Sequence, residues 1–116
     1  MTRRVRLHGD FLADFERQIA WLERRGELAW IEGLEGDVIR ALELLSAYPA
    51  AGVLQHREGA IALRRLVLSS TPYLAWYVYD DDRPAGDLWL VRLFHSRQLR
   101  PAPAPSRWLG RRVTKK

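Results

Sequence analysis

The residues best suited to binding chemistry lie near the end of the chain. From Ser96 to Lys116 there are seven basic residues and no acidic one, a net charge of +7, whereas the preceding 95 residues have 12 basic and 14 acidic groups. Seventeen of the 19 basic residues of the chain are arginine, whose planar guanidinium binds phosphate or carboxylate through two parallel hydrogen bonds. Such a basic block indicates an acidic partner or nucleic acid, although a solubilising tail would have the same composition.

Other chemistries are disfavoured by the residue types. The chain has no cysteine, which excludes a disulfide, a thiolate nucleophile and a cysteine-based zinc site. The three histidines, His8, His56 and His95, are too scattered to predict a structural metal site. The three consecutive aspartates at 80–82 lack the spaced ligands of a calcium loop and predict a solvated turn. We therefore expect no metal and no cofactor.

Length and composition predict one globular domain. The 116 residues are 47% hydrophobic and 28% charged, which is typical of a folded soluble chain and not of a disordered or fibrous one. No apolar run approaches the roughly 18 residues that a membrane-spanning helix needs. The N-terminal residues do not lead into the apolar core of a signal peptide, so we expect a cytoplasmic protein without membrane contact.

Two segments have helical periodicity. In the first, apolar residues recur at helical spacing after Asp10, which we expect to be the N-cap, and Gly26 is suited to a left-handed C-cap. The second runs from about Leu28 and must stop before Pro49, because proline disfavours helix at the preceding residue. The short link at Gly26 predicts an antiparallel helical hairpin.

The remaining segments have strand-like patterns. A short strand is expected around Val5, and after a loop over residues 49–59 we expect three strands at 61–68, 73–79 and 88–94. Short turns between these three predict an antiparallel meander, one face of which the helical hairpin covers. The predicted order β-α-α-β-β-β is an α+β sandwich of two layers.

The end of the chain has a different character. We expect residues 1–98 to form the domain and residues 99–116 a basic, proline-rich tail, in which alternating prolines predict an extended spacer. Because an indole is costly to leave in water, Trp108 is expected to dock against its own domain or a partner. The other four tryptophans, Trp21, Trp30, Trp76 and Trp89, are expected in the core, with at most one of them exposed to a partner groove.

Several short sequences occur in a characteristic order between residues 3 and 98. They are Val5 in a short strand, Tyr48-Pro49-Ala50-Ala51-Gly52 closing the second helix, Leu63-Arg64-Arg65-Leu66 in a strand, the aromatic run at 73–79, and Arg92-Leu93-Phe94-His95-Ser96-Arg97 ending the last strand. In this order the chain resembles the RelE/ParE superfamily of bacterial toxins from toxin-antitoxin modules. The tail lies outside the resemblance.

The resemblance implies one of two activities. ParE-like members inhibit DNA gyrase by trapping its cleaved complex with DNA, and RelE-like members cut mRNA on the ribosome without a metal. Cutting RNA requires proton transfer and cations, for which His95, Arg65 and Arg92 are the candidates. Nuclease members commonly have an arginine near the start of the third strand and a tyrosine or lysine cluster at its end. This chain has Leu74 there, and Ser96 directly follows His95.

These departures favour a ParE-like gyrase inhibitor that is not itself an enzyme. The mRNA endoribonuclease is the alternative, and a nontoxic relative that only binds a partner is the third possibility. A histidine that ends a buried strand is also commonly structural, which is the competing interpretation of His95.

The ParE-like interpretation implies growth arrest, plasmid stabilisation and a cognate, ParD-like antitoxin that forms a hetero-oligomer with the toxin. We expect the antitoxin to contact Arg64 and Arg92. Arg64 and Arg65 are neighbours and project to opposite faces of their strand, so we expect one of the two to pair with an acid on the helices. The residues expected to bind the target are Arg97, Arg100, Arg107, Trp108, Arg111 and Arg112.

Overall fold

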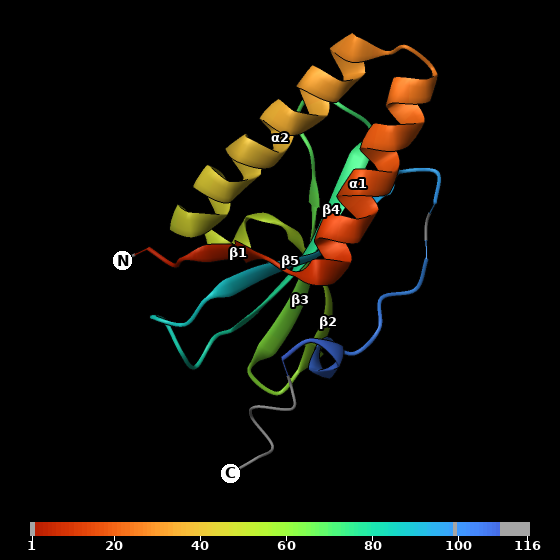
Figure 1. The fold of residues 1–116 in the computed structure, drawn as a ribbon. Coiled ribbons are helices and arrows are strands. Elements are labelled where there is room, and N and C mark those ends of the chain that lie inside the picture. The colour runs from red at the N-terminus through yellow and green to blue at the C-terminus, as the bar shows by residue number, and fades with distance from the viewer. Residues whose placement is uncertain (1, 99, 110–116) are drawn as a thin grey trace.

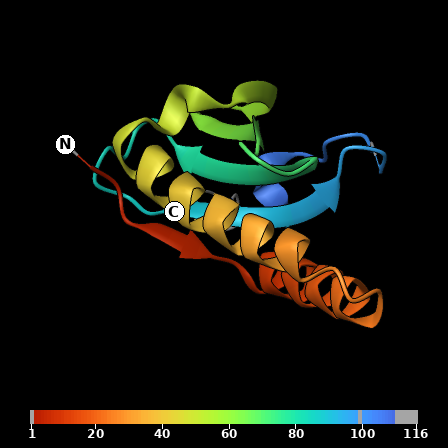
Figure 2. The same ribbon diagram turned by 90° about the horizontal axis from the view of Figure 1, so that it is seen from above.

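Two helices cover one side of a mixed sheet (Figures 1 and 2). The computed structural model describes residues 2–98 and 100–109. Its elements are β1 (Val5–Leu7), α1 (Gly9–Arg24), α2 (Leu28–Ala47), η1 (Pro49–Ala51), β2 (Val53–Glu58), β3 (Ile61–Val67), β4 (Tyr73–Asp80), β5 (Leu88–His95) and η2 (Pro105–Arg107). The strand order is β1-β5-β4-β3-β2, in which β1 runs parallel to β5 and all other neighbours are antiparallel. The general α+β prediction is therefore confirmed.

The helical hairpin was largely predictable. Gly26 links the helices with a φ of +69°, and α2 ends at Ala47, before Pro49, as expected. The predicted N-cap was wrong, because His8 caps α1 and accepts a hydrogen bond from the backbone N–H of Asp10 through Nδ1 at 3.0 Å. An imidazole nitrogen can thus replace the usual side-chain oxygen. Neither helix has the length and hydropathy to cross a membrane, and no other helix of the described residues does.

Strand β2 corrects the sequence prediction. The loop expected over residues 49–59 contains this strand, which pairs with β3 through a two-residue turn where Gly59 has a φ of +61°. Because β2 is the outermost strand, five of its six side chains are exposed and the sequence lacks the alternation of a half-buried strand. The meander therefore has four strands, not three.

The face of the sheet under the helices holds the larger core. Leu34 and Leu45 of α2 and Phe11 and Leu22 of α1 are buried there against side chains such as Tyr77 of β4. These are the apolar stripes that the sequence pattern placed toward the sheet. The helices and this face therefore form the two predicted layers.

A buried carboxylate fastens α2 to the turn between β3 and β4. Asp37 accepts hydrogen bonds from the hydroxyls of Ser69, Ser70 and Thr71, from the backbone N–H of Ser70 and from the Arg40 guanidinium. Burial alone would raise the pKa of Asp37, but the hydrogen bonds from Thr71, Ser70 and Arg40 outweigh it and hold the pKa well below its ordinary value. The ionised carboxylate is thus a structural part of the fold.

Residues 100–109 of the predicted tail cover part of the opposite face of the sheet. In Figure 1, residues 100–109 descend along the right side of the view and end with η2 beside β2 and β3. Ala102, Trp108 and Leu109 pack on this face, so the expected docking of Trp108 on its own domain is confirmed. The sheet residues beneath them are Ile61, Leu63, Leu74, Trp76, Val78, Val91 and Phe94. We refer to residues 100–109 as the strap.

The remaining tryptophans divide into two groups. Trp76 is buried and Trp89 is half-buried, as expected for core residues. Trp21 and Trp30 are 46% and 42% exposed, so two of the four tryptophans lie outside the core where at most one was expected. Trp21 belongs to the candidate site.

Candidate functional site: an arginine-lined cleft

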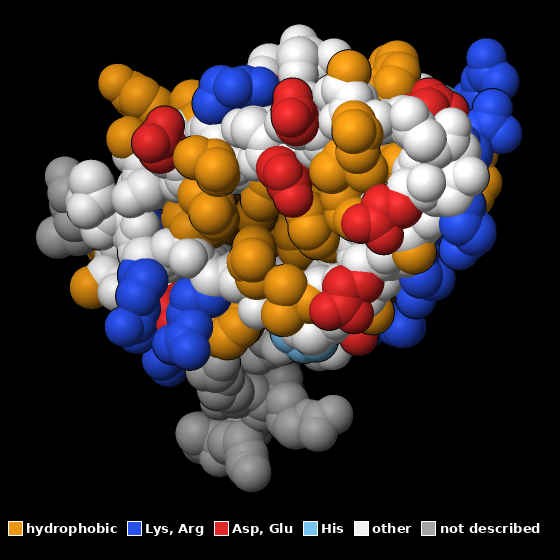
Figure 3. Space-filling model, turned by 45° about the horizontal axis from the view of Figure 1, so that its top comes forward, with side chains coloured by type: hydrophobic (Ala, Val, Ile, Leu, Met, Phe, Trp, Pro, Cys, Tyr) orange, Lys and Arg blue, Asp and Glu red, His pale blue; other side chains and the backbone are white. Residues whose placement is uncertain are grey.

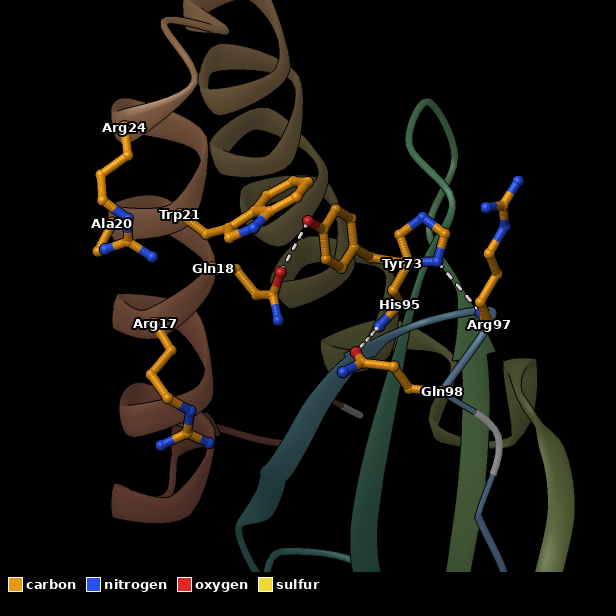
Figure 4. A pocket seen from close by; sticks show the side chains of 9 residues that line it. All are labelled: Arg17, Gln18, Ala20, Trp21, Arg24, Tyr73, His95, Arg97 and Gln98. Atoms are coloured by element: carbon orange, nitrogen blue, oxygen red, sulfur yellow. Dashed lines mark hydrogen bonds between the residues drawn. The ribbon is translucent and has the colours of Figure 1, made fainter.

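A cleft of about 620 Å³ opens between α1 and the ends of β4 and β5 (Figure 4). Its lining residues are Arg17, Gln18, Ala20, Trp21, Arg24, Tyr73, His95, Arg97 and Gln98. Three of these nine are arginines and none is acidic. The cleft is therefore a region of positive potential that attracts anions. We call it the arginine cleft.

One wall of the cleft is a stripe on α1. Arg17, Trp21 and Arg24 follow one another at spacings of four and three residues, which places them on one face of the helix. The guanidinium of Arg25 lies 4.8 Å from the Trp21 ring centroid, within range of a cation–π interaction. The stripe therefore alternates cations with an exposed aromatic ring. The spacing of Arg17, Trp21 and Arg24 can be read from the sequence, but the sequence favours a core position for Trp21.

The charges of the three lining arginines are unequally compensated. Arg17 donates to the carboxylate of Asp14, but it shares this carboxylate with Arg92 and is therefore only partly compensated. Arg24 and Arg97 form no ion pair among the residues that the structure describes. These two guanidiniums come from elements that are far apart in the sequence, and they supply the uncompensated charge of the cleft.

His95 is fixed at the inner end of the cleft. Its Nδ1 accepts a hydrogen bond from the backbone N–H of Arg97 at 3.1 Å, and its own backbone N–H donates to Oε1 of Gln98 at 2.9 Å. The imidazole also packs edge to face on Tyr73, with 5.4 Å between ring centroids. Because Nδ1 accepts, the neutral ring carries its proton on Nε2. His95 thus has a structural role in the turn after β5, as the competing interpretation proposed.

Tyr73 completes the floor of the cleft. Its hydroxyl donates to Oε1 of Gln18 at 2.9 Å, which connects β4 to α1 (Figure 4). Burial, with a smaller contribution from the charge of Glu27, raises the pKa of Tyr73 above its ordinary value. The phenol therefore stays protonated and holds Gln18 in place at neutral pH.

Arg92 is held in an internal ion pair outside the cleft. Its Nε and one terminal nitrogen donate to the buried carboxylate of Asp14 at 2.6 and 3.2 Å. The hydrogen bond to Asp14 is the main reason that the pKa of Arg92 is raised above its ordinary value. Asp14 also accepts from the backbone N–H of Leu93 at 2.9 Å. Since β1 pairs with β5 only as far as Leu90, Asp14 covers the strand edge beyond that point.

Arg64 has an equally structural environment. It donates to the hydroxyl of Tyr79 and to the carbonyl of Gly52, both at 2.9 Å. The hydroxyl of Tyr77 donates to the carbonyl of Pro49 at 2.6 Å and accepts from the N–H of Gly52 at 2.8 Å. Burial, the largest effect, raises the pKa of Tyr77 to about 12. A Cβ at Gly52 would lie 2.6 Å from a backbone oxygen, so this segment requires glycine.

The three residues proposed for catalysis are not brought together. His95 lines the arginine cleft, Arg92 is paired with Asp14, and the half-buried Arg65 has an Nε without a partner among the described residues. Neither Arg64 nor Arg65 forms an ion pair with an acid on the helices within the described residues, so that prediction was wrong. The strand arginine that does so is Arg92.

The predicted target-binding residues are also divided. Arg97 lines the cleft, whereas the guanidiniums of Arg100 and Arg107 each lie 5.6 Å from an aromatic ring centroid, that of Phe94 and that of Trp108. Trp108 packs on the sheet. The other two predicted residues, Arg111 and Arg112, lie outside the described residues.

Comparison with known proteins adds no family to this geometry. The sequence matches no protein-family model and no curated protein. No group of three or more histidine, cysteine, aspartate or glutamate residues in the described ranges is placed to hold a metal ion. The site must therefore be interpreted from its own residues.

Proposed function

We propose that this chain is the toxin of a RelE/ParE-type toxin-antitoxin module and that it inhibits DNA gyrase by trapping its cleaved complex with DNA. In this proposal the arginine cleft binds the target, and the protein acts in the cytoplasm without catalysing a reaction. The observation that carries the proposal is a cleft with uncompensated arginines in which the one candidate catalyst, His95, is engaged in a turn.

The fold supports the family assignment. A helical hairpin on a largely antiparallel sheet agrees with the architecture that the resemblance implies, and the Tyr48–Gly52 segment closes α2 through contacts to Tyr77 and Arg64. These contacts explain in physical terms why a Pro-Ala-Ala-Gly sequence stands beside an arginine-bearing strand.

The strand arginines that a nuclease would use are engaged within the chain, which supports a binding function. General acid-base catalysis needs a proton donor or acceptor within hydrogen-bond reach of the reacting group, and phosphoryl chemistry needs cations directed at the same point. Arg92 is held by Asp14, and Arg64 donates to the carbonyl of Gly52. Binding of an acidic surface or of DNA requires only the cleft arginines that remain uncompensated.

The direct test is incubation of the purified protein with gyrase, ATP and supercoiled plasmid, followed by detergent and protease. We expect linear DNA to accumulate with the wild type and to be lost with the double variant Arg24→Glu and Arg97→Glu. The double variant Arg4→Glu and Arg83→Glu is the matched control, because these arginines pair with Asp87 and Asp80 at the surface and do not line the cleft. No linear DNA from the wild type, with gyrase active, contradicts the proposal.

A ribosome-dependent mRNA endoribonuclease is the second candidate, and the placement of His95 in the cleft favours it. Three arginines line the same cleft, so a proton-transfer group and cations are both present there. The discriminating variant is His95→Asn, whose side-chain oxygen can still accept the turn hydrogen bond of Nδ1. Loss of mRNA cleavage on ribosomes by this folded variant would identify a nuclease, whereas a gyrase inhibitor should retain its effect.

The partner that silences the toxin is proposed to be an antitoxin encoded with it. Arg64 and Arg92, the expected contacts, are half-buried and occupied within the chain. A better-suited surface is the apolar groove of about 350 Å³ between α1 and α2 (Figure 3), where Ile39 is 58% exposed and Glu35 stands at the rim. We propose that an antitoxin helix with apolar and basic residues binds there.

This groove can be tested in cells. Co-expression of the gene neighbouring the toxin gene should relieve growth arrest by the wild type and by Arg64→Gln, but not by Ile39→Arg, because a charge would lie in the apolar contact. Equal relief of all three would contradict binding in the groove.

A further inference from the structure

We propose that the arginine cleft binds single-stranded nucleic acid directly, with phosphates on its guanidiniums and a base stacked on Trp21. The inference rests on the proposed function only for its biological setting, in which the ligand is a DNA strand that gyrase has opened. Binding itself can be measured without gyrase.

The charge distribution is the first argument. Arg24 lines the cleft from α1 and Arg97 lines it from the turn after β5, both without an ion pair among the described residues, and none of the nine lining residues is acidic (Figure 4). Two nearby acids are engaged, since Asp14 binds Arg17 and Arg92 and Glu27 binds Arg25. A groove with uncompensated guanidiniums on two walls is the electrostatic requirement for holding a sugar-phosphate backbone.

The placement of Trp21 is the second argument. At 1.5 Å per residue, Arg17 and Arg24 are separated by about 10 Å along the axis of α1, with Trp21 between them. Trp21 is nearly half exposed, and the contact with Arg25 fixes its ring. Of the other aromatic side chains in the cleft, Tyr73 is buried and hydrogen-bonded to Gln18. An exposed indole between two cations is suited to stacking one base between two phosphate contacts.

The same observations argue against an acidic protein surface as the ligand. Carboxylates would satisfy the arginines but would leave the exposed indole without a function. The cleft volume of about 620 Å³ is within the range of small-ligand pockets and suits a nucleotide-sized segment better than a broad protein interface.

Fluorescence anisotropy of the full chain with labelled ten-nucleotide oligo-dT and oligo-U tests the inference. We expect saturable binding that weakens about sevenfold between 50 and 200 mM salt, as about two phosphate contacts on a single strand require. Trp21→Leu, Arg24→Glu and Arg97→Glu should each weaken binding about tenfold or more, equivalent to about 1.4 kcal/mol. Arg4→Glu makes the same charge change outside the cleft and should have little effect, and circular dichroism confirms that each variant folds.

The two oligonucleotides distinguish the sources of the ligand. Tighter binding of oligo-dT supports the setting in gyrase, and tighter binding of oligo-U supports the nuclease candidate, while both support the cleft as a nucleic-acid site. Equal losses with Arg4→Glu, or competition by polyglutamate as effective as by oligonucleotide with no effect of Trp21→Leu, would overturn it. If neither oligonucleotide binds but linear DNA accumulates with gyrase, this inference fails and the proposed function stands. If an oligonucleotide binds but no linear DNA forms, this inference stands and the proposed function fails.

Discussion

The two faces of the sheet are covered in different ways. On one face, α1 and α2 bury a continuous core and the Asp37 network locks α2 to the sheet turn. On the other face, the strap contributes mainly Ala102, Trp108 and Leu109. Two further hydrogen bonds connect it to surface carboxylates, from the Trp108 Nε1 to Asp10 at 3.1 Å and from the Ser106 N–H to Glu58 at 2.9 Å.

This difference implies two levels of stability. Removing the helices would remove most of the core, whereas we expect release of the strap to leave the helix-covered face intact, because the two faces have separate clusters. Stability in proteins is commonly uneven in this way, and segments with few buried contacts open first. The strap is therefore more than a carrier of positive charge, and deleting it would uncover an apolar face. Charge reversal at single arginines is the cleaner test of a role in target binding.

Of the substitutions considered, we expect one in the core of the helix-covered face to have the largest effect on stability. Leu34 of α2 is fully buried, so Leu34→Ala should lower the free energy of unfolding by about 3 kcal/mol through lost burial and a cavity. Urea unfolding followed by tryptophan fluorescence measures this change. The exposed neighbour Glu35 provides the control, because Glu35→Ala should change stability by less than about 0.5 kcal/mol. Similar values for both variants would contradict the assignment of this face as the main core.

We expect the second-largest effect in the pH dependence of the free energy of unfolding. The pKa of Asp37 is held below its ordinary value of 3.8 in the folded protein, so in acid the unfolded chain binds a proton more readily than the folded one. The stabilisation is fully present above this value and is lost as pH falls below it toward the folded pKa. Asp37→Asn should flatten this part of the stability profile.

Asp87 is the comparison for that profile. Its pKa is also lowered, chiefly by the hydrogen bond from Arg4, but the pair lies at the surface. Urea unfolding between pH 2.5 and 7 should therefore show a smaller change for Asp87→Asn than for Asp37→Asn. Equal changes would show that burial of the Asp37 network does not control acid stability.

A smaller effect is expected on the strap-covered face. Leu109→Ala removes a buried side chain, as Leu34→Ala does, but we expect the strap to detach while the helices stay packed, because it packs on the other face of the sheet. The loss is thus limited to the free energy of strap docking, and we expect about 1 to 2 kcal/mol. An apolar dye and amide hydrogen exchange should report an exposed sheet face. A loss as large as that of Leu34→Ala would show that both covers unfold together.

The same contrast explains how much of the fold could be predicted. Both helices and strands β3 to β5 have a local pattern, so the sequence located them. Strand β2 lacks the pattern because its side chains are exposed. The strap lacks it because it covers the sheet with an irregular segment rather than with a regular helix or strand. Neither hydrophobic period nor turn composition identifies a segment of this kind.

The candidate site was harder to predict for a related reason. His95 and Arg97 were identified because they end a strand, but Arg24 meets them only through packing of α1 on β5. The Asp14–Arg92 pair likewise joins residues 78 positions apart and could not be inferred from local spacing. Trp21 was misplaced because a tryptophan among apolar residues favours the core on average, and only the packed structure leaves it exposed.

The smallest effect concerns the link between the two covers. The Trp108 Nε1 donates to Asp10 at the start of α1, so the strap and the helix layer are joined at the sheet edge. Asp10→Ala removes this acceptor but also a favourable charge in the first helical turn, so a double-mutant cycle with Trp108→Phe is needed to isolate the bond.

We expect a coupling of about 0.5 to 1.5 kcal/mol in urea unfolding, the usual range for one hydrogen bond. Asp10→Asn keeps an acceptor and should retain part of that coupling. If the cycle shows no coupling, the strap is held by its apolar contacts alone and its release would leave α1 unchanged. If coupling is present, release of the strap would remove a stabilising contact at the N-terminal end of α1. This helix forms one wall of the arginine cleft.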